Sequence, residues 1–245
     1  MNPVQISNGK ALILYDADCL VQADNSFFDP EQWRARQALT GVATGRGTTF
    51  FVRDGDHEWV VRHYRRGGLI AKLIADRYLW RGIEATRAWR EWRLLATLYS
   101  EGFPVPQPIA ARVVRSGLFY RADIVTRRLD ATPLSERLQH GRLSNPSWRA
   151  IGTTLRRFHD AGVWHADLNA HNILLRDGRV YLLDFDRGRR GKLTSHQAQG
   201  NLLRLRRSLD KLNHLHRVFC FDEEDWKALS RGYQGKAEPH HDNSA

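Results

Sequence analysis

The chain has 245 residues, of which 42% are hydrophobic, with eight Trp and ten Phe, and it carries a formal net charge of +11. This composition is typical of an ordered globular protein and excludes an intrinsically disordered one. The apolar run Ala11–Leu14 is too short for a membrane span or a signal peptide, and two cysteines are too few for a disulfide framework or a thiolate metal site. By default, we therefore expect a protein of the cytoplasm.

The positive charge is concentrated in two stretches. Nine Lys or Arg stand against two Asp or Glu over residues 186–217, and nine against three over residues 62–93. Solvated helix faces often have this composition. The functional alternatives are an anionic membrane surface, a phosphorylated or carboxylated acceptor, and nucleic acid. Charge alone does not choose among them.

The first half of the chain has the pattern of a small sheet with one helix. Apolar and β-branched runs at 49–53 and 58–64 flank Asp54-Gly55-Asp56, which predicts a hairpin. A long helix is predicted over residues 84–100, and Gly102 follows it as a stop signal. The residues expected to share one face of this helix are Trp92, Leu95, Ala96 and Tyr99.

After three closely spaced prolines, the pattern first predicts strands and then helices. The two strands are expected at 109–115 and 119–126, and the helices at 146–160, 196–216 and 223–232. The chain contains no repeat and no linker rich in Pro, Gly or Ser. We therefore predict one domain with two lobes, the first mainly β and the second mainly α.

The expected fold class is α+β, in the two-lobed arrangement of the protein-kinase-like fold. Residues 1–40 are expected to pack on the smaller lobe or to lead into it. The smaller, mainly β lobe is assigned to residues 41–126 and the larger, mainly α lobe to residues 127–233. Residues 234–245 have the composition of a disordered tail.

The most informative feature is the segment from His165 to Asn172, which reads H-x-D-L-x-x-x-N, followed by Asp184 at the end of a short apolar run. Phosphoryl transfer needs a carboxylate to orient and deprotonate the attacking hydroxyl, and an amide and a second carboxylate to hold Mg²⁺ on the nucleotide phosphates. Asp167 is the predicted base, and Asn172 and Asp184 are the predicted metal ligands. The alternative is a polar loop between two strands that carries these residues by chance, which the fixed spacing disfavours.

An upstream nucleotide site would complete this chemistry. Gly45 and Gly47 precede a predicted strand, where glycines let backbone N–H groups approach phosphate closely. Arg62 stands on the next strand in a V-A-I-K-like context, where a cation is expected. We predict that Arg62 pairs with Glu91 rather than Glu84, because Glu91 lies well inside the helical pattern. The alternative is that Arg62 points to solvent.

Two positions differ from the pattern of regulated protein kinases. Asn169 stands where many of them have a lysine, and Asp186 replaces the Gly of D-F-G. No A-P-E-type segment follows, and the basic run Arg187–Lys192 comes directly after Asp186. These differences favour a constitutive kinase of a small-molecule or lipid-linked acceptor.

Together these residues resemble the bacterial lipopolysaccharide-core kinases of the protein-kinase-like superfamily, and among them the kinases of 3-deoxy-D-manno-octulosonic acid (Kdo). H-x-D-L-x-x-x-N specifies only the superfamily, whereas the string Arg62-His-Tyr-Arg-Arg-Gly-Gly68 is much narrower. The likeness runs over roughly residues 10–232. The other strings that carry it are Thr44–Thr48, Glu91–Leu95, Pro104–Pro108, Trp164–Asn172, Asp184–Gly188 and Asn201–Leu212.

The resemblance implies phosphorylation of the 4-hydroxyl of a Kdo sugar on lipid A precursor, with ATP and Mg²⁺ as cofactors, by a peripheral enzyme at the cytoplasmic face of the inner membrane. The charge agrees with this, because the acceptor and the membrane surface are both anionic. The mixed run at 65–74 is expected either to lie at the membrane interface or to pack on the smaller lobe. The cations expected to line the acceptor entrance are Arg187, Arg189, Arg190 and Lys192.

Other functions remain as alternatives. A heptose or other lipopolysaccharide-core kinase, a small-molecule kinase or a protein Ser/Thr kinase would share the loop. An aminoglycoside phosphotransferase would need an acidic lobe to bind its polycationic acceptor, whereas residues 186–217 are basic. From other classes, a catalytically dead binding module is opposed by the intact Asp167, Asn172 and Asp184. No nucleic-acid partner is expected, because no RNA-binding module is recognisable.

Overall fold

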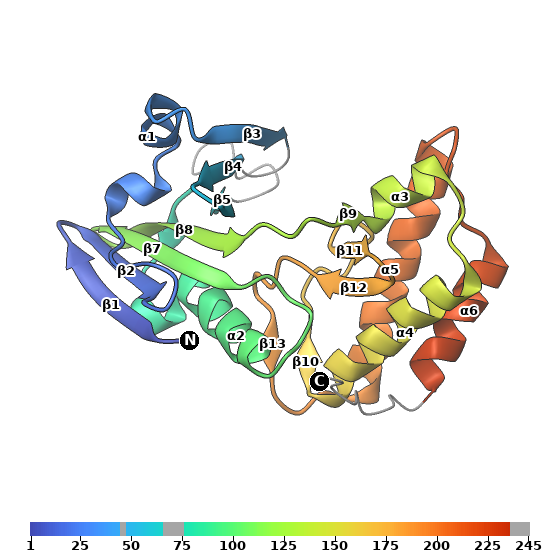
Figure 1. The fold of residues 1–245 in the computed structure, drawn as a ribbon. Coiled ribbons are helices and arrows are strands. Elements are labelled where there is room, and N and C mark those ends of the chain that lie inside the picture. Colours follow the sequence, from blue (N-terminus) through green and yellow to red (C-terminus); the bar gives the residue numbers. More distant parts are fainter. Residues whose placement is uncertain (45–47, 66–75, 236–245) are drawn as a thin grey trace, which may run out of the picture. The chain divides into compact units, whose positions relative to one another are not determined.

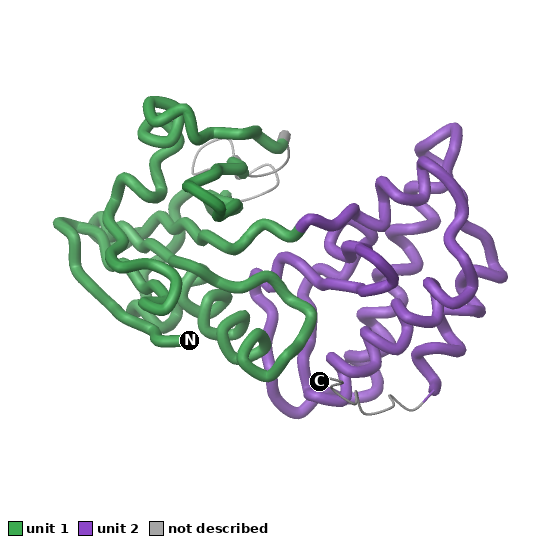
Figure 2. Tube along the Cα trace, viewed as in Figure 1, with its two compact units in different colours: residues 1–129 green, residues 130–245 purple. Residues whose placement is uncertain are grey.

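The computed structural model of the chain describes residues 1–44, 48–65 and 76–235. The chain divides into two compact units, residues 1–129 and residues 130–245, which are coloured separately in Figure 2. The division falls after Leu129, just beyond the end of a strand at Arg127, whereas the sequence analysis placed the lobe boundary after residue 126.

Unit 1 is built on an antiparallel sheet, in which the described residues form eight strands (Figure 1). Seven strands lie in the order β1-β2-β7-β8-β5-β4-β3, and the short β6 pairs with β8. The hairpin predicted around Gly55 is β4–β5, and the strands predicted after the prolines are β7–β8. The bounds are Pro3–Asn8 (β1), Ala11–Asp16 (β2), Leu39–Thr44 (β3), Thr48–Asp54 (β4), His57–His63 (β5), Tyr78–Leu79 (β6), Pro108–Ser116 (β7) and Phe119–Arg127 (β8).

The first two strands were not predicted from the sequence. β1 and β2 form a hairpin that joins the sheet through the pairing of β2 with β7. Ile13 and Leu14 are buried there, and every residue of β2 is at least partly covered. A short apolar run without alternation does not distinguish a buried strand from a piece of helix, because periodicity carries no signal in it.

Helix α2 (Arg87–Ser100) packs on β7 and β8, and a short 3-10 turn (Ile83–Ala85) precedes it. The helix therefore begins at Arg87 rather than at residue 84 as predicted. Its buried face includes Trp89, Trp92, Leu95 and Leu98. Tyr99 was predicted on this face, and that prediction was wrong, because its side chain is 39% exposed.

A second hydrophobic cluster of unit 1 gathers around Trp59 of β5. A 3-10 turn (Asn25–Phe28) and the short helix α1 (Pro30–Ala35) bring Phe27 and Trp33 against it, with the Phe27 and Trp59 ring centroids 4.9 Å apart. The Trp33 indole N–H donates to the backbone oxygen of Phe27 at 2.9 Å. This cluster fixes the segment before β3 on the sheet.

Unit 2 is mainly helical, with two small sheets (Figure 1). The predicted helices at 146–160, 196–216 and 223–232 are confirmed as α4, α5 and α6, with ends shifted by one or two residues, and α3 was not predicted. The helix bounds are Leu134–His140 (α3), Asn145–Asp160 (α4), Ser195–Leu215 (α5) and Glu223–Gln234 (α6). The strands are Thr132–Pro133 (β9), Val163–Trp164 (β10), Ile173–Arg176 (β11), Arg179–Leu182 (β12) and Arg189–Arg190 (β13).

Two glycines allow α4 and α6 to cross at backbone contact. A Cβ atom on Gly152 would lie 2.0 Å from the backbone oxygen of Leu229, and one on Gly232 would lie 2.1 Å from that of Arg149. Only a residue without a side chain fits such an approach. The crossing therefore depends on glycine at both positions.

Helix α5 is 21 residues long and begins with a capping box made by Thr194 and Gln197. Leu205, Leu209 and Leu212 are buried, while most charged residues of the helix are exposed. None of the helices in the described part of the chain combines the length and the apolar character that a membrane span requires.

Candidate active site

Unit 1 holds the predicted ion pair between β5 and α2. Nη2 of Arg62 lies 2.6 Å from both carboxylate oxygens of Glu91, and the hydroxyl of Tyr64 donates to the same carboxylate. The Glu91 side chain is 2% exposed, so burial of its charge requires such partners. The predicted pairing is confirmed. The predicted contact of Arg62 with nucleotide phosphates stays a prediction.

The choice of Glu91 over Glu84 is confirmed as well. Glu84 forms an exposed ion pair with Arg93 instead, at 2.9 Å. The guanidinium of Arg62 also stacks on the Tyr64 ring, 4.9 Å from its centroid. Arg62 is therefore held by a carboxylate and by an aromatic ring, rather than pointing to solvent.

The predicted phosphate cover lies outside the described residues. Gly45 and Gly47 fall between β3 and β4, and most of the mixed run at 65–74 follows β5 beyond Arg65, so neither prediction can be compared with the structure. The same holds for nearly all of the predicted tail.

In unit 2, hydrogen bonds within the loop hold the backbone of Asp167. Its carbonyl oxygen accepts from the side-chain amides of Asn169, at 3.0 Å, and Asn172, at 2.9 Å. Its N–H donates to Nδ1 of His165 at 3.2 Å. The Asp167 side chain is 50% exposed. The loop therefore fixes the backbone and leaves the carboxylate accessible.

His165 connects this loop to the segment that leads to Asp184. Because its Nδ1 accepts a hydrogen bond, the proton lies on Nε2, which donates to the backbone oxygen of Leu183 at 2.7 Å. Burial lowers the pKa of His165, so the ring is neutral at physiological pH. The histidine of the motif thus has a positioning role in the structure.

The two predicted metal ligands, Asn172 and Asp184, lie at the same end of the β11–β12 hairpin. Ile173 is paired with Leu182, and the backbone N–H of Leu183 donates to the carbonyl of Asn172 at 2.9 Å. Asp184 has a left-handed backbone, with φ of 59°, a conformation that Asp tolerates better than most residues. Its Oδ1 accepts from the N–H of Asp186 at 3.4 Å.

These two side chains fit a magnesium ion. The amide nitrogen of Asn172 is engaged with the Asp167 carbonyl, so its amide oxygen is the atom that can meet a cation. Mg²⁺ prefers oxygen ligands and is usually held by one or two protein groups plus phosphates and waters. Among the described residues no cluster of three or more His, Cys, Asp or Glu is arranged to hold a metal. The oxygen pair is therefore the candidate, and its role stays a prediction.

Helix α5 supplies contacts that sequence reasoning missed. Asn201 brackets the backbone of His165, accepting from its N–H at 3.2 Å and donating to its carbonyl at 2.8 Å. The Ser208 hydroxyl accepts from the N–H of Ala170 at 3.2 Å. Between them, Nη1 of Arg204 donates to Oδ1 of Asp167 at 3.3 Å. Spacing of three and four residues puts all three on one face of α5, and this periodicity was the available signal.

The basic segment after Asp186 is partly engaged in local structure. The guanidinium of Arg189 lies 4.8 Å from the ring centroid of Trp164, to which its strand is paired. Nε of Arg190 donates to the backbone oxygen of Ala161 at 3.2 Å. Both side chains are exposed. Their predicted contact with an acceptor stays a prediction, as do those of Arg187 and Lys192.

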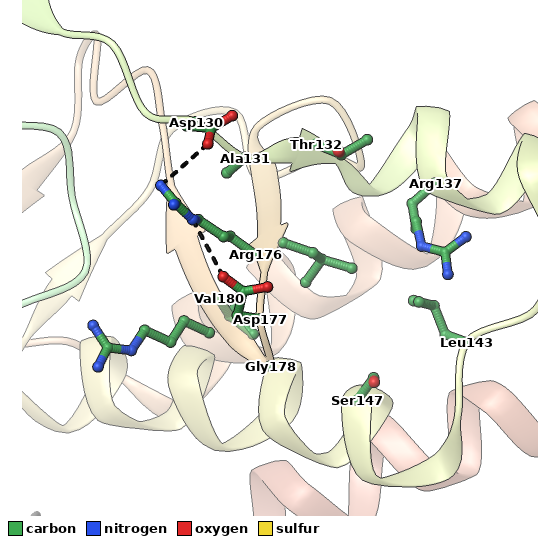
Figure 3. Close-up of a pocket in the computed structure, with 12 residues that line it drawn as sticks. Asp130, Ala131, Thr132, Arg137, Leu143, Ser147, Arg176, Asp177, Gly178 and Val180 are labelled. Atoms are coloured by element: carbon green, nitrogen blue, oxygen red, sulfur yellow. Dashed lines mark hydrogen bonds and ion pairs between the residues drawn. The ribbon is translucent and has the colours of Figure 1, made fainter.

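A cavity of about 600 Å³ in unit 2 lies at the other end of the same hairpin, around the turn at Asp177 and Gly178 (Figure 3). Arg176 forms ion pairs there with Asp130 at 3.4 Å and Asp177 at 3.3 Å. Asn172 and Leu183 lie at the opposite end of the β11–β12 hairpin from this turn. The length of the hairpin therefore separates the cavity from the candidate metal ligands.

The chain is similar to known lipopolysaccharide kinases over most of its length. Residues 30–233 match the model of the lipopolysaccharide kinase (Kdo/WaaP) family. The chain is 41% identical over 228 residues to 3-deoxy-D-manno-octulosonic acid kinase from Vibrio parahaemolyticus, covering 92% of this chain and 95% of the relative. It is 42% identical over 241 residues to the enzyme of the same name from Actinobacillus succinogenes, covering 94% and 99%. A solved structure described as WaaP in complex with acyl carrier protein shares the fold, with a TM-score of 0.54, 19% identity and coverage of 84% of this chain and 82% of that one.

Proposed function

The chain belongs to the lipopolysaccharide kinase (Kdo/WaaP) family, and we propose that it phosphorylates the 4-hydroxyl of Kdo on lipid A precursor. The reaction is an ATP-dependent transfer to a sugar hydroxyl, and it belongs to lipopolysaccharide core biosynthesis. The relatives that support this acceptor are about 40% identical over nearly the whole chain. None of the comparisons favours the alternatives of a protein kinase, an aminoglycoside phosphotransferase or a dead module.

The observation that carries the proposal is the geometry around Asp167. Three hydrogen bonds hold its backbone while its carboxylate stays half-exposed. A fixed carboxylate that an incoming hydroxyl can reach is what a catalytic base requires. In the proposed reaction, the acceptor hydroxyl transfers its proton to Asp167 as its oxygen bonds to the γ-phosphorus and the bond to the leaving ADP breaks.

Mg·ATP, when bound, supplies the phosphoryl group and the charge that neutralises the phosphates. The amide oxygen of Asn172 and the carboxylate of Asp184 would hold the metal. Arg62, which Glu91 fixes in unit 1, would contact the phosphates through its guanidinium. Gly45 and Gly47 would let the backbone of their turn approach the phosphates.

We also propose peripheral attachment at the cytoplasmic face of the inner membrane. The net charge of +11 and the excess of cations over residues 186–217 support it, because each basic residue near an anionic leaflet contributes about 1 kcal/mol. Salt screens this attraction. Vesicles that contain anionic lipid should therefore pellet the protein at low salt and release it at high salt. Binding to neutral vesicles that salt does not change would contradict an electrostatic attachment.

A phosphotransfer assay tests the acceptor. Labelled ATP is incubated with the protein and either Kdo-bearing lipid A precursor or the same precursor without Kdo. We expect transfer only to the Kdo-bearing acceptor, and mass spectrometry should place one phosphate on the Kdo fragment and none on the glucosamine backbone. Label on glucosamine, on a protein substrate or on an aminoglycoside would refute the proposal.

A further inference from the structure

The exposed side of α5 carries a row of cations that starts at the predicted base. Arg204, Arg207 and Lys211 are all exposed and are separated by three and four residues, so they follow one another along one side of the helix. The first of them, Arg204, contacts the catalytic loop through the 3.3 Å hydrogen bond from its Nη1 to Oδ1 of Asp167. At a rise of 1.5 Å per residue, the row extends about 10 Å from Arg204 to Lys211.

These three cations differ from the fourth on the same segment of helix. Arg206 is neutralised by Asp210, at 2.9 Å, and by Glu223, also at 2.9 Å. Arg207 contacts the backbone oxygen of Leu203, at 3.3 Å. Within the described part of the chain, neither Arg207 nor Lys211 forms an ion pair with a carboxylate. Their charges are therefore available to a ligand, whereas that of Arg206 is used inside the fold.

Arg204 is suited to hold two carboxylates at once. A guanidinium has five N–H donors in a planar fork, and the contact with Asp167 uses one nitrogen. Both side chains of the pair are about half-exposed, so the pair is weak and an arriving anion can share the guanidinium at little cost. An acceptor carboxylate bound to the remaining donors would lie beside the base.

We propose that Arg204, Arg207 and Lys211 form the anion-binding track for the acceptor, with Arg204 holding the carboxylate of the sugar beside Asp167 and the other two holding phosphate groups farther along the same molecule. This inference rests on the proposed function. It assigns the first acceptor contact to α5 rather than to the segment after Asp186, where Arg189 and Arg190 are engaged with Trp164 and Ala161.

Steady-state kinetics of single variants test the role of Arg204. Arg204→Gln should raise the acceptor KM at least about tenfold, since a charge-assisted hydrogen bond of this size is lost, while the ATP KM stays within about twofold of wild type. Arg204→Lys keeps the positive charge but lacks the planar fork of N–H donors. Its acceptor KM should therefore lie between those of wild type and Arg204→Gln. Arg156→Gln is the matched control, because Arg156 also forms an exposed pair with an aspartate of unit 2, Asp160, at 2.7 Å. This control should change neither constant.

A second acceptor isolates the carboxylate. Wild type should use a synthetic Kdo glycoside much better than its carboxamide, and Arg204→Gln should use the two about equally well. If Arg204→Gln lowers kcat, leaves the acceptor KM unchanged and still discriminates between the two acceptors, Arg204 merely supports the base and the inference is overturned. If wild type phosphorylates neither acceptor nor Kdo-bearing lipid A precursor, the proposed function itself has failed.

The outer two cations are tested with the lipid-linked acceptor. Arg207→Gln combined with Lys211→Gln should raise the KM for lipid A precursor carrying Kdo, and should leave the KM for the simple Kdo glycoside unchanged, because the glycoside has no phosphates. Arg187→Gln combined with Lys192→Gln serves as the comparison at the other basic segment. A larger effect of that second pair on the lipid-linked acceptor would overturn the assignment of the track to α5.

Discussion

The two units hold their candidate functional groups in different ways. In unit 1, Arg62 and Glu91 are 29 residues apart and meet inside the fold, where Glu91 is almost fully buried. In unit 2, Asp167 is held by residues two to five positions away, and its carboxylate is half-exposed. The first arrangement is made by packing between a strand and a helix, and the second by a loop that bonds to itself.

In unit 1 the same residues should therefore serve both stability and catalysis, whereas in unit 2 different residues should serve them. Removing Arg62 would take a charged partner from the buried carboxylate of Glu91, so function and stability should fall together. Removing the charge of Asp167 breaks an exposed pair with Arg204, which contributes little to stability. In unit 2 stability should instead depend on residues that do no chemistry, such as Gly152 and the buried histidines.

The largest expected effect is on turnover, from Asp167→Asn. Loss of the base should lower kcat by a factor of about 100 or more, while the free energy of unfolding changes by less than about 0.5 kcal/mol, as for an exposed site. Asp160→Asn, at another exposed aspartate of unit 2, is the control and should leave kcat unchanged. Asp184→Asn should also weaken Mg·ATP binding. A tenth of the wild-type rate in Asp167→Asn would show that the base is misassigned.

The buried pair gives the next effect, on stability and on kinetics at once. Arg62→Ala should destabilise the protein by about 3 kcal/mol, because it removes a charged partner of the buried Glu91 carboxylate. The ATP KM should rise and kcat should fall. Arg93 lies on the same helix as Glu91 and forms an exposed pair with Glu84 of the preceding 3-10 turn, so Arg93→Ala should cost less than about 1 kcal/mol. Equal denaturant midpoints for the two variants would show that the buried pair contributes no more to stability than the exposed one.

Glycine substitutions test the framework of unit 2. Gly152→Ala should destabilise the protein by about 1–3 kcal/mol, because the new methyl group overlaps backbone atoms of α6. Among the described residues, nothing outside the adjacent turns of α5 lies within 4 Å of a Cβ atom on Gly200, so Gly200→Ala should stabilise the protein by up to about 1 kcal/mol through helix propensity. Chemical denaturation measures both, and a neutral Gly152→Ala would mean that α4 and α6 do not cross at backbone contact.

The smallest effect is a pH dependence of stability. Burial lowers the pKa of His159 and of His165 below the ordinary value of 6.5. At a pH between the folded and the unfolded pKa of these histidines, the unfolded chain binds protons that the folded chain does not. The free energy of unfolding should therefore be highest above about pH 6.5 and fall as the pH drops below that value. Melting temperatures from pH 8 to 5 should show this loss, and His159→Gln should reduce its slope. An unchanged slope in that variant would exclude His159 as a contributor.

Local features of the candidate site follow from the sequence, because they depend on residues close together in the chain. The spacing of Asp167, Asn172 and Asp184 predicted a phosphotransfer loop, and the loop is held by hydrogen bonds over two and five positions. The paired strands around Gly55 and three helices of unit 2 were predicted with errors of one or two residues at their ends. The pairing of Arg62 with Glu91 was also predicted, from the expected placement of a cation on a strand and a carboxylate on a helix.

Apart from the pairing of Arg62 with Glu91, the contacts that link distant segments were decided only by the tertiary structure. Asn201, Arg204 and Ser208 meet the catalytic loop 36 to 38 residues away. Their spacing puts them on one face of α5, but no local pattern shows which segment covers that face. The joining of β1 and β2 to the sheet, and the crossing of α4 and α6 at Gly152, belong to the same class. Neighbouring residue types determine hydrogen bonds within a loop, whereas the register of one element on another depends on how all the buried side chains pack together.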